Sequence, residues 1–192
     1  TGARIDGTPE INDFAFFVSS EIKPNNTINI RPGLRFIKNS VYSAPPVIPS
    51  INTKFTLYNN FDLRVAYAYG FRSPALRELY YNFVDANHII VGNPHLKAEH
   101  SSSFNGSLSC TLPKTKQGHQ NVITLSSFYN TFNNLINYAT SPTSTDTTIT
   151  VNIDKYKTTG IMIEDKLQSK NFTASLGFSY IGRYNQLADA EG

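Results

Sequence analysis

Residues 72–96 of this 192-residue chain contain the side chains best suited to bind an anionic ligand. The candidate ligand-binding residues are Arg72, Arg77, Tyr80, Tyr81 and His88. The arginines could pair with an anion because a guanidinium donates hydrogen bonds in a planar fork, and the aromatic rings could stack on a ligand. Alternatively, the arginines and Lys97 are ordinary charges exposed to water, and the tyrosines belong to an aromatic belt at a membrane boundary.

Other chemistry has little support in the sequence. The 4 histidines lie at positions 88, 95, 100 and 119, and none is paired at the i,i+4 spacing of a helical metal site, so loop histidines are the preferred interpretation. Glu78 and Glu99 are not accompanied by a nucleophile motif or a phosphate-binding loop. The single cysteine, Cys110, is expected to act as a small apolar residue. We therefore expect no catalytic residue, no bound metal and no cofactor.

Composition narrows the class of protein. The 17 Lys+Arg and 14 Asp+Glu give a net charge of +3 without a basic run, which disfavours a nucleic-acid partner. No apolar run approaches the roughly 20 residues of a spanning helix. Aromatic residues make up 12% of the chain and charged residues only 16%, a bias that suits either a membrane β-barrel or a soluble β-sandwich.

The dominant sequence pattern has a period of two residues. Between Phe61 and Arg72, large apolar residues alternate with small or charged ones, which puts the two sets on opposite faces of a strand but would scatter them around a helix. A strand of about 9 to 11 residues is long enough to cross a bilayer at a tilt. Similar patterns predict about eight strands. The other candidates are 11–23, 27–38 with Arg31 and Arg35 on its polar row, 51–58, 104–112, 122–138, 148–168 and 172–180.

The connections between these segments alternate in length. Tight turns are predicted at 24–26, 59–60 and 169–171, and long loops near 39–49, 72–96 and 139–147. Short turns at one end and long loops at the other are typical of outer-membrane barrels. The link at 113–120 is longer than this pattern requires. Within the longest loop, Ser73 and Pro74 could start a short helix with Leu76, Leu79, Tyr80 and Phe83 on one face.

Four motifs in order resemble those of TonB-dependent outer-membrane receptors. They are RVAYAYGFRSP at 64–74 followed by Glu78-Leu79-Tyr80, GNPHLKAE at 92–99, Phe128-Tyr129-Asn130 with Asn134-Leu135-Ile136, and TGIMIE at 159–164. The resemblance covers residues 10–184. It implies an all-β fold: an antiparallel, up-and-down transmembrane β-barrel segment of about eight strands. Family barrels have about 22 strands around an N-terminal plug domain. Residues 1–192 are therefore expected to be an interior part of such a barrel domain, without the plug.

The resemblance also implies a function in transport. We expect a Gram-negative outer-membrane receptor that takes up a siderophore, cobalamin, haem or glycan, energised by TonB, in which this chain supplies barrel wall and loops. The expected partners are outer-membrane lipid, the plug domain, the remaining strands and the transported small molecule, and TonB acts only indirectly through the plug. The alternative is a soluble lipocalin-like β-barrel that binds a small ligand inside, with its apolar face pointing inward.

The alternation also predicts which residues face lipid. We expect lipid contact on one row and the barrel lumen on the other. The lipid-facing residues would be Leu63, Val65, Tyr67, Phe178 and Tyr180, and the lumen-facing residues Arg64, Arg72, Ser175 and Ser179.

Overall fold

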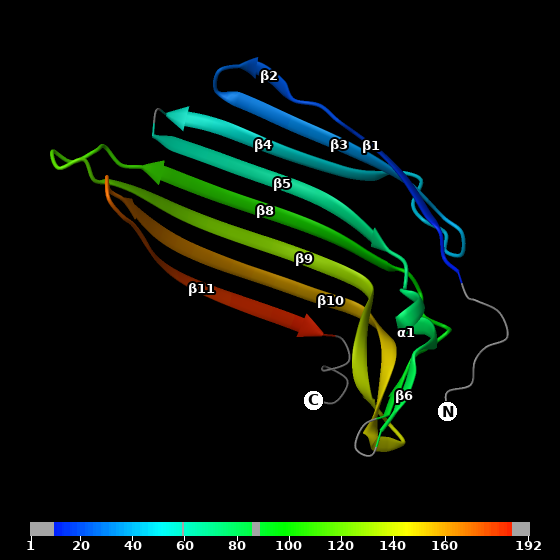
Figure 1. Ribbon diagram of the computed structural model, residues 1–192. Helices are drawn as coiled ribbons and strands as arrows, with labels where there is room; N and C mark the ends of the chain where they lie inside the picture. Colours follow the sequence, from blue (N-terminus) through cyan, green and yellow to red (C-terminus); the bar gives the residue numbers. More distant parts are fainter. Residues whose placement is uncertain (1–9, 59, 86–88, 186–192) are drawn as a thin grey trace.

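The computed structural model describes residues 10–58, 60–85 and 89–185, and these form a curved, open β-sheet (Figure 1). Its strands are β1 (Asp13–Ser19), β2 (Ile22–Asn25), β3 (Ile28–Asn39), β4 (Ile48–Tyr58), β5 (Phe61–Arg72), β6 (Asn82–Val84), β7 (Ile89–Val91), β8 (Glu99–Thr111), β9 (Gln120–Ser141), β10 (Ser144–Gln168) and β11 (Thr173–Asn185). One short helix, α1 (Leu76–Tyr80), lies between β5 and β6. No helix among the described residues is long and apolar enough to cross a bilayer.

The wall of the sheet is an antiparallel meander, as predicted. β1 and β2 both pair with β3, so they are two parts of one edge strand. From β3 the order continues β4, β5, β8, β9, β10 and β11. The expected number of about eight crossing strands is therefore confirmed. The total of 11 strands is larger because it counts the two parts of the edge strand separately and includes β6 and β7.

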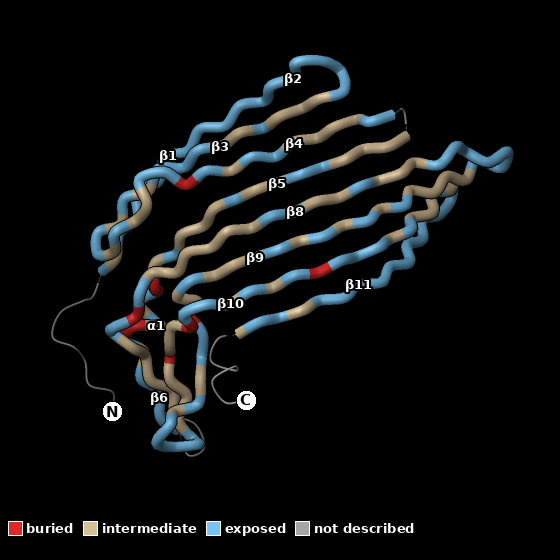
Figure 2. The backbone as a smooth tube through the Cα atoms, turned by 180° about the vertical axis from the view of Figure 1, so that it is seen from behind, coloured by how far each residue is buried: buried red, intermediate tan, exposed pale blue. Residues whose placement is uncertain are grey.

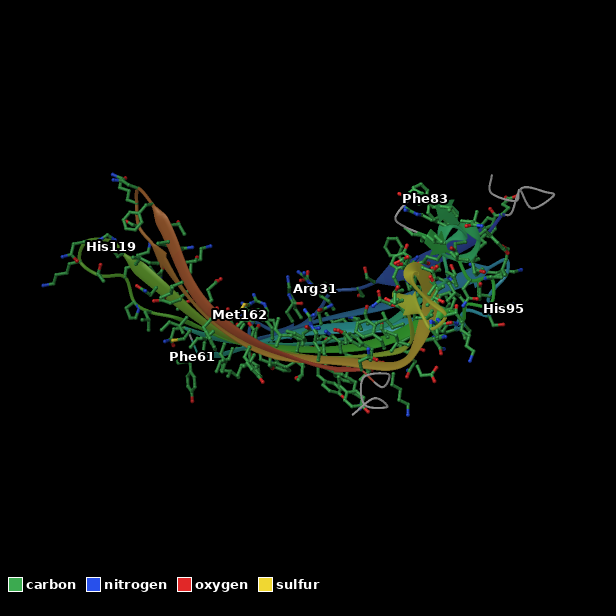
Figure 3. All side chains as sticks on the ribbon, turned by 90° about the horizontal axis from the view of Figure 1, so that it is seen from below. Arg31, Phe61, Phe83, His95, His119 and Met162 are labelled. Carbon is green, nitrogen blue, oxygen red and sulfur yellow. The ribbon has the colours of Figure 1, made fainter. Side chains whose placement is uncertain are left out.

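The two faces of the wall differ in polarity. In Figure 3, Arg31 and Met162 lie on the concave face and Phe61 on the convex face. Aligned rows of side chains cross both faces. One concave row runs through Asn29, Lys54, Arg64, Ser107, Ser126, Met162 and Ser179, and the adjacent convex row through Ile28, Phe55, Leu63, Leu108, Leu125, Ile163 and Phe178.

This arrangement agrees with the predicted facing of β5 and β11 and opposes the lipocalin alternative. A small soluble barrel with an internal ligand site needs its apolar row on the concave face, where this sheet places most of its charged and hydroxyl side chains. The convex row is instead highly exposed at Leu176 (81%) and Phe178 (69%). An apolar convex face suits contact with lipid.

The connections of the wall are short at one end of the strands and long at the other (Figure 1). At the short-turn end, Thr27 accepts the hydrogen bond of the Thr56 N–H, and Asn60 accepts that of the Thr111 N–H. At the long-loop end lie residues 40–47 and the segment 73–98, which contains α1, β6 and β7. The link at 112–119, which was predicted to be unusually long for its end, lies at the short-turn end.

Two local expectations at the long-loop end were wrong. Residues 139–147, predicted as a loop, belong mostly to strands, because β9 continues to Ser141 and β10 begins at Ser144. β7 adds in parallel to β10 at Thr147–Ile149, and this pairing of β-branched residues favours strand. Phe83 does not continue the face of α1, because the helix ends at Tyr80 and Phe83 lies in β6.

Candidate functional site

The charged side chains at the base of the 73–98 segment form a cluster of one arginine and two carboxylates, which we call the rim cluster: Arg72, Glu78 and Glu99. The Arg72 guanidinium donates to both carboxylate oxygens of Glu78 at 3.0 and 2.9 Å, and to Oε2 of Glu99 at 3.2 Å. Register explains the second pair, because Arg72 lies directly opposite Glu99 on β8. Both carboxylates also bind backbone. Glu78 accepts from the Ala75 N–H at 2.8 Å and Glu99 from the Ile136 N–H at 3.2 Å.

A small apolar core lies beside the rim cluster. Leu79, Leu96 and Ile136 are buried together, and Ile11 packs against them. Buried positions gather near α1, while the wall is mostly exposed or half-buried (Figure 2). The backbone of Gly92 packs directly against the backbone of α1 here, with no space for a side chain, because an added Cβ would lie 2.8 Å from the carbonyl carbon of Leu79. The resemblance motifs at 64–74 and 92–99 therefore meet in space and hold α1 against the sheet.

The amide of Asn152 connects the same segment to the β9–β10 hairpin. Its Oδ1 accepts from the Lys97 N–H at 2.8 Å, while its Nδ2 donates to the carbonyl oxygens of Lys97 at 3.1 Å and Asn134 at 2.9 Å. Asn134 has a positive φ of 54°, which marks an irregular point on β9. The hairpin beyond Asn134 is therefore fixed to the end of the 73–98 segment.

Two of the predicted ligand-binding residues stack on each other. The Arg77 guanidinium carbon lies 4.8 Å from the centre of the Tyr81 ring, and Tyr81 stacks on Phe83 with ring centres 6.1 Å apart and planes inclined by 2°. We call these three residues the aromatic ladder. Phe83 is 39% exposed and lies on the concave side of the molecule (Figure 3). A cation next to parallel rings presents both charge and a flat apolar surface.

Tyr80 lies apart from the ladder and is 42% exposed. Burial raises the pKa of Tyr42 in the 40–47 loop, and the Tyr80 hydroxyl raises that pKa further. His88 lies outside the described residues. The structure thus joins Arg77 to Tyr81, places Arg72 in the rim cluster and leaves Tyr80 outside both groups. The ligand-binding role of all five residues remains a prediction.

A hollow on the concave face, which we call the rim hollow, contains a cation that the sequence interpretation did not select. Its lining comprises Ile11, Asp13, Arg35, Ile37, Phe71, Arg72, Ser73, Pro74, Ala75 and Leu76. Arg35 has no ion-pair partner among the described residues, whereas Arg72 has two. The sequence indicated only that Arg35 lies on the polar row of 27–38. The hollow itself depends on the tertiary structure, because it forms between β3 and the start of α1.

Metal chemistry and acid–base chemistry have no comparable support at this end. In the described part of the chain, no group of three histidine, cysteine, aspartate or glutamate side chains lies where it could hold a metal ion. The arrangement supplies a free guanidinium, an arginine–aromatic stack and a fixed loop. These are means of binding an anionic or aromatic molecule.

Comparison with known proteins gave one family and several structural neighbours. The family described as "TonB dependent receptor-like, beta-barrel" matches residues 1–192. The siderophore receptor PirA from Pseudomonas aeruginosa is 19% identical with a TM-score of 0.73, over 91% of this chain and 35% of that one. The hemophore receptor HasR of Serratia marcescens, solved with its hemophore HasA and heme, is 15% identical with a TM-score of 0.74, over 90% of this chain and 34% of that one.

The ferric enterobactin receptor PfeA from Pseudomonas aeruginosa, in a mutant bound to enterobactin, is 20% identical with a TM-score of 0.69, over 90% of this chain and 27% of that one. No curated protein matches the sequence. At these identities the structural neighbours establish the fold alone. The chain spans about a third of the first of them.

Proposed function

This chain belongs to the TonB-dependent receptor β-barrel family, and on that premise we propose that it forms part of the wall and outer loops of a Gram-negative outer-membrane receptor for a scarce nutrient. The division of the sheet into an apolar convex face and a polar concave face supports this proposal most strongly. It allows the convex face to contact lipid and the concave face to contact a plug domain or water. The transport cycle would be energised by TonB, acting through the plug.

The open edges of the sheet fit the same proposal. Among the described residues, β11 pairs only with β10, and the β1–β2 edge pairs only with β3. Unpaired backbone N–H and C=O groups are too costly in hydrocarbon, so a spanning sheet must close. Further strands of the receptor would pair with these two edges and complete the barrel.

Ligand capture is assigned to the long-loop end, which we place outside the cell. The rim hollow offers Arg35, and the aromatic ladder offers Arg77 with Tyr81 and Phe83. Phe83 lies on the concave side of the molecule (Figure 3), and the rim hollow is lined by the residues that lead into α1 at the long-loop end, where a ligand would enter the lumen. The substrate would be an anionic or aromatic nutrient chelate of the siderophore or haem class, by analogy with what PirA, PfeA and HasR are described as binding.

Ligand binding by cells that express the intact receptor tests the proposal, with ferric enterobactin and haem as probes. Removing residues 82–91 deletes β6 and β7, and with them Phe83, while the pairing of β8, β9 and β10 remains. Because loop closure costs change little with length, the barrel should still assemble. We expect at least tenfold weaker binding of the active probe, and a similar loss for Arg35→Ala combined with Arg77→Ala.

A matched control is Lys155→Ala, which removes a cation from the convex row of β10. It should leave ligand binding unchanged. If the wild-type receptor assembles but binds neither probe, the proposed substrate class is wrong. If the deletion variant binds like the wild type, these loops do not capture the ligand.

A further inference from the structure

The unusually long connection at the short-turn end carries a group of unpaired lysines. Residues 112–119 form a folded turn, in which the Thr115 N–H donates to the His119 carbonyl at 2.8 Å and the Gly118 N–H to the Thr115 carbonyl at 2.9 Å. The positive φ of Gly118, 83°, suits this turn. Lys114 and Lys116 are exposed on it. The turn therefore displays two ammonium groups from an ordered support.

A neighbouring turn adds a third lysine. The β10–β11 connection is closed by a hydrogen bond from the Ser169 N–H to the Phe172 carbonyl at 2.9 Å, and Lys170 is exposed on it. The rings of His119 and Phe172 contact each other with centres 6.3 Å apart, which brings the two turns together. We call Lys114, Lys116 and Lys170 the basic turn patch.

The charge of this patch is not neutralised within the described part of the chain. None of its three lysines has a carboxylate within 4.0 Å there, although such ion pairs occur elsewhere, for example between Lys54 and Asp62 at 3.0 Å. Two acidic residues lie in the adjacent part of β10. Asp165 accepts hydrogen bonds from Asn121 at 2.9 Å, and Glu164, also among the described residues, forms no ion pair with any of the three lysines. The patch thus offers three free cations while the whole chain carries a net charge of only +3.

Apolar side chains join the patch to the convex face. Phe172 is 52% exposed, and the alternation that begins with it continues through Leu176 to Phe178 on the convex row. Leu112, at the start of the other turn, is 38% exposed. An aromatic ring at the edge of an apolar face, with lysines beyond it, is the arrangement expected at the boundary between acyl chains and headgroups.

From this geometry we infer that the basic turn patch binds the phosphate of an anionic phospholipid in the leaflet at the short-turn end of the barrel. The ring of Phe172 would lie at the level of the upper acyl chains, and the flexible lysine stems would extend to the headgroup phosphates. The orientation rests on the proposed function, which places this end in the periplasm. The ligand is a lipid surface because the patch continues the face that contacts lipid.

The test uses the intact receptor in phosphatidylcholine vesicles that contain a small fraction of phosphatidylglycerol carrying a photoactivatable headgroup. After illumination, cross-links are mapped with a protease that does not cut at lysine. We expect cross-links within 112–119 and 169–172, and fewer with a phosphatidylcholine probe carrying the same group. Each lysine near an anionic surface contributes roughly a fivefold gain in binding, so Lys114→Gln, Lys116→Gln and Lys170→Gln together should reduce labelling at these turns on the order of 100-fold.

Two sets of variants control for charge and position. Replacing the same three lysines by arginine keeps the charge and should keep the labelling. Replacing Lys38, Lys97 and Lys155 by glutamine removes the same charge at the opposite end and should leave labelling of the two turns unchanged. Equal labelling by the two probes, or undiminished labelling of the first glutamine variant, would overturn the inference.

Ligand binding separates this inference from the proposed function. The glutamine variant of the basic turn patch should still bind the nutrient probe, because the patch lies at the opposite end from the rim hollow. Specific labelling of the turns in a receptor that binds neither ferric enterobactin nor haem would reject the proposed substrate class and leave the lipid site standing. Reaction of Lys114 with a membrane-impermeant amine reagent on intact cells would reject the periplasmic orientation.

Discussion

Val65→Arg and Ala66→Arg should differ strongly in their effect on membrane assembly. Val65 lies near the middle of β5 on the convex face, between Thr53 and Gly106, and is 48% exposed. Ala66 is its neighbour in sequence but lies on the concave face between Asn52 and Asn105. The two substitutions therefore add the same charge at the same depth of the strand, on opposite sides of the sheet.

The expected difference follows from the two environments. An arginine near the midplane of a lipid-facing row costs about 2 to 4 kcal/mol. At position 66 the guanidinium would enter a polar region that contains Asn29, Ser107 and other hydrophilic side chains. It would be repelled by Arg31 and Arg64, but in water such repulsion costs only about 1 kcal/mol or less. The free energy of folding into the bilayer should therefore differ by roughly 1 to 4 kcal/mol between the variants, and Val65→Arg should be the less stable of the two.

The assay is urea-dependent folding of the intact receptor into phospholipid vesicles, followed by the heat-sensitive electrophoretic mobility of folded barrels. Val65→Thr serves as a control for loss of the valine packing without charge. Equal destabilisation by the two arginine substitutions, or a larger effect of Ala66→Arg, would refute the assignment of the convex face to lipid.

Two further predictions concern residues with close neighbours. Glu99→Gln removes the charge that Arg72 contacts at 3.2 Å and should destabilise the end of the 73–98 segment locally by about 1 to 2 kcal/mol. The measurement is amide hydrogen exchange at Ile136, whose N–H donates to Glu99 and should exchange faster in this variant. The control variant Glu10→Gln should not change that rate. Gly160→Ala should lower the free energy of unfolding by about 1 to 3 kcal/mol, because the added Cβ would approach the Phe128 ring and lie 3.1 Å from the Tyr180 carbonyl oxygen. The control variant is Gly106→Ala, whose added Cβ would have its nearest neighbour at 3.6 Å. It should be nearly neutral in the same urea-dependent unfolding assay.

The rim cluster changes the interpretation of the most recognisable motif residues. Arg72 was a ligand-binding candidate because it carries a charge beside a long loop. In the structure its guanidinium donates hydrogen bonds to two carboxylates, and those carboxylates accept from the backbone N–H groups of Ala75, just before α1, and of Ile136 in β9. Holding the 73–98 segment in place explains these residues without a ligand. Arg35 and Arg77 are the stronger candidates for contact with an anion.

The strands of the wall could be predicted from sequence because alternation is a local property. In β5, each pair of adjacent residues, such as Arg64 and Val65, already differs in polarity, and no distant partner is needed to see it. Tight turns such as 169–171 were predictable for the same reason. The family motifs added the order of the strands in the sheet. They occur in the same order in the barrels of the family, where each strand pairs with the next strand along the chain.

Only the tertiary structure decided which face is outside and which charges meet. Period two separates two faces without naming either as concave, and the curvature of the whole sheet makes that choice. Register brings Arg72 opposite Glu99, 27 residues later, and the packing of α1 adds Glu78. The antiparallel pairing of β9 with β10 likewise continues as strand through most of the 139–147 region, and β7 adds to β10 at Thr147–Ile149. These features depend on contacts between segments distant in the chain, and local patterns of polarity contain no information about such distances.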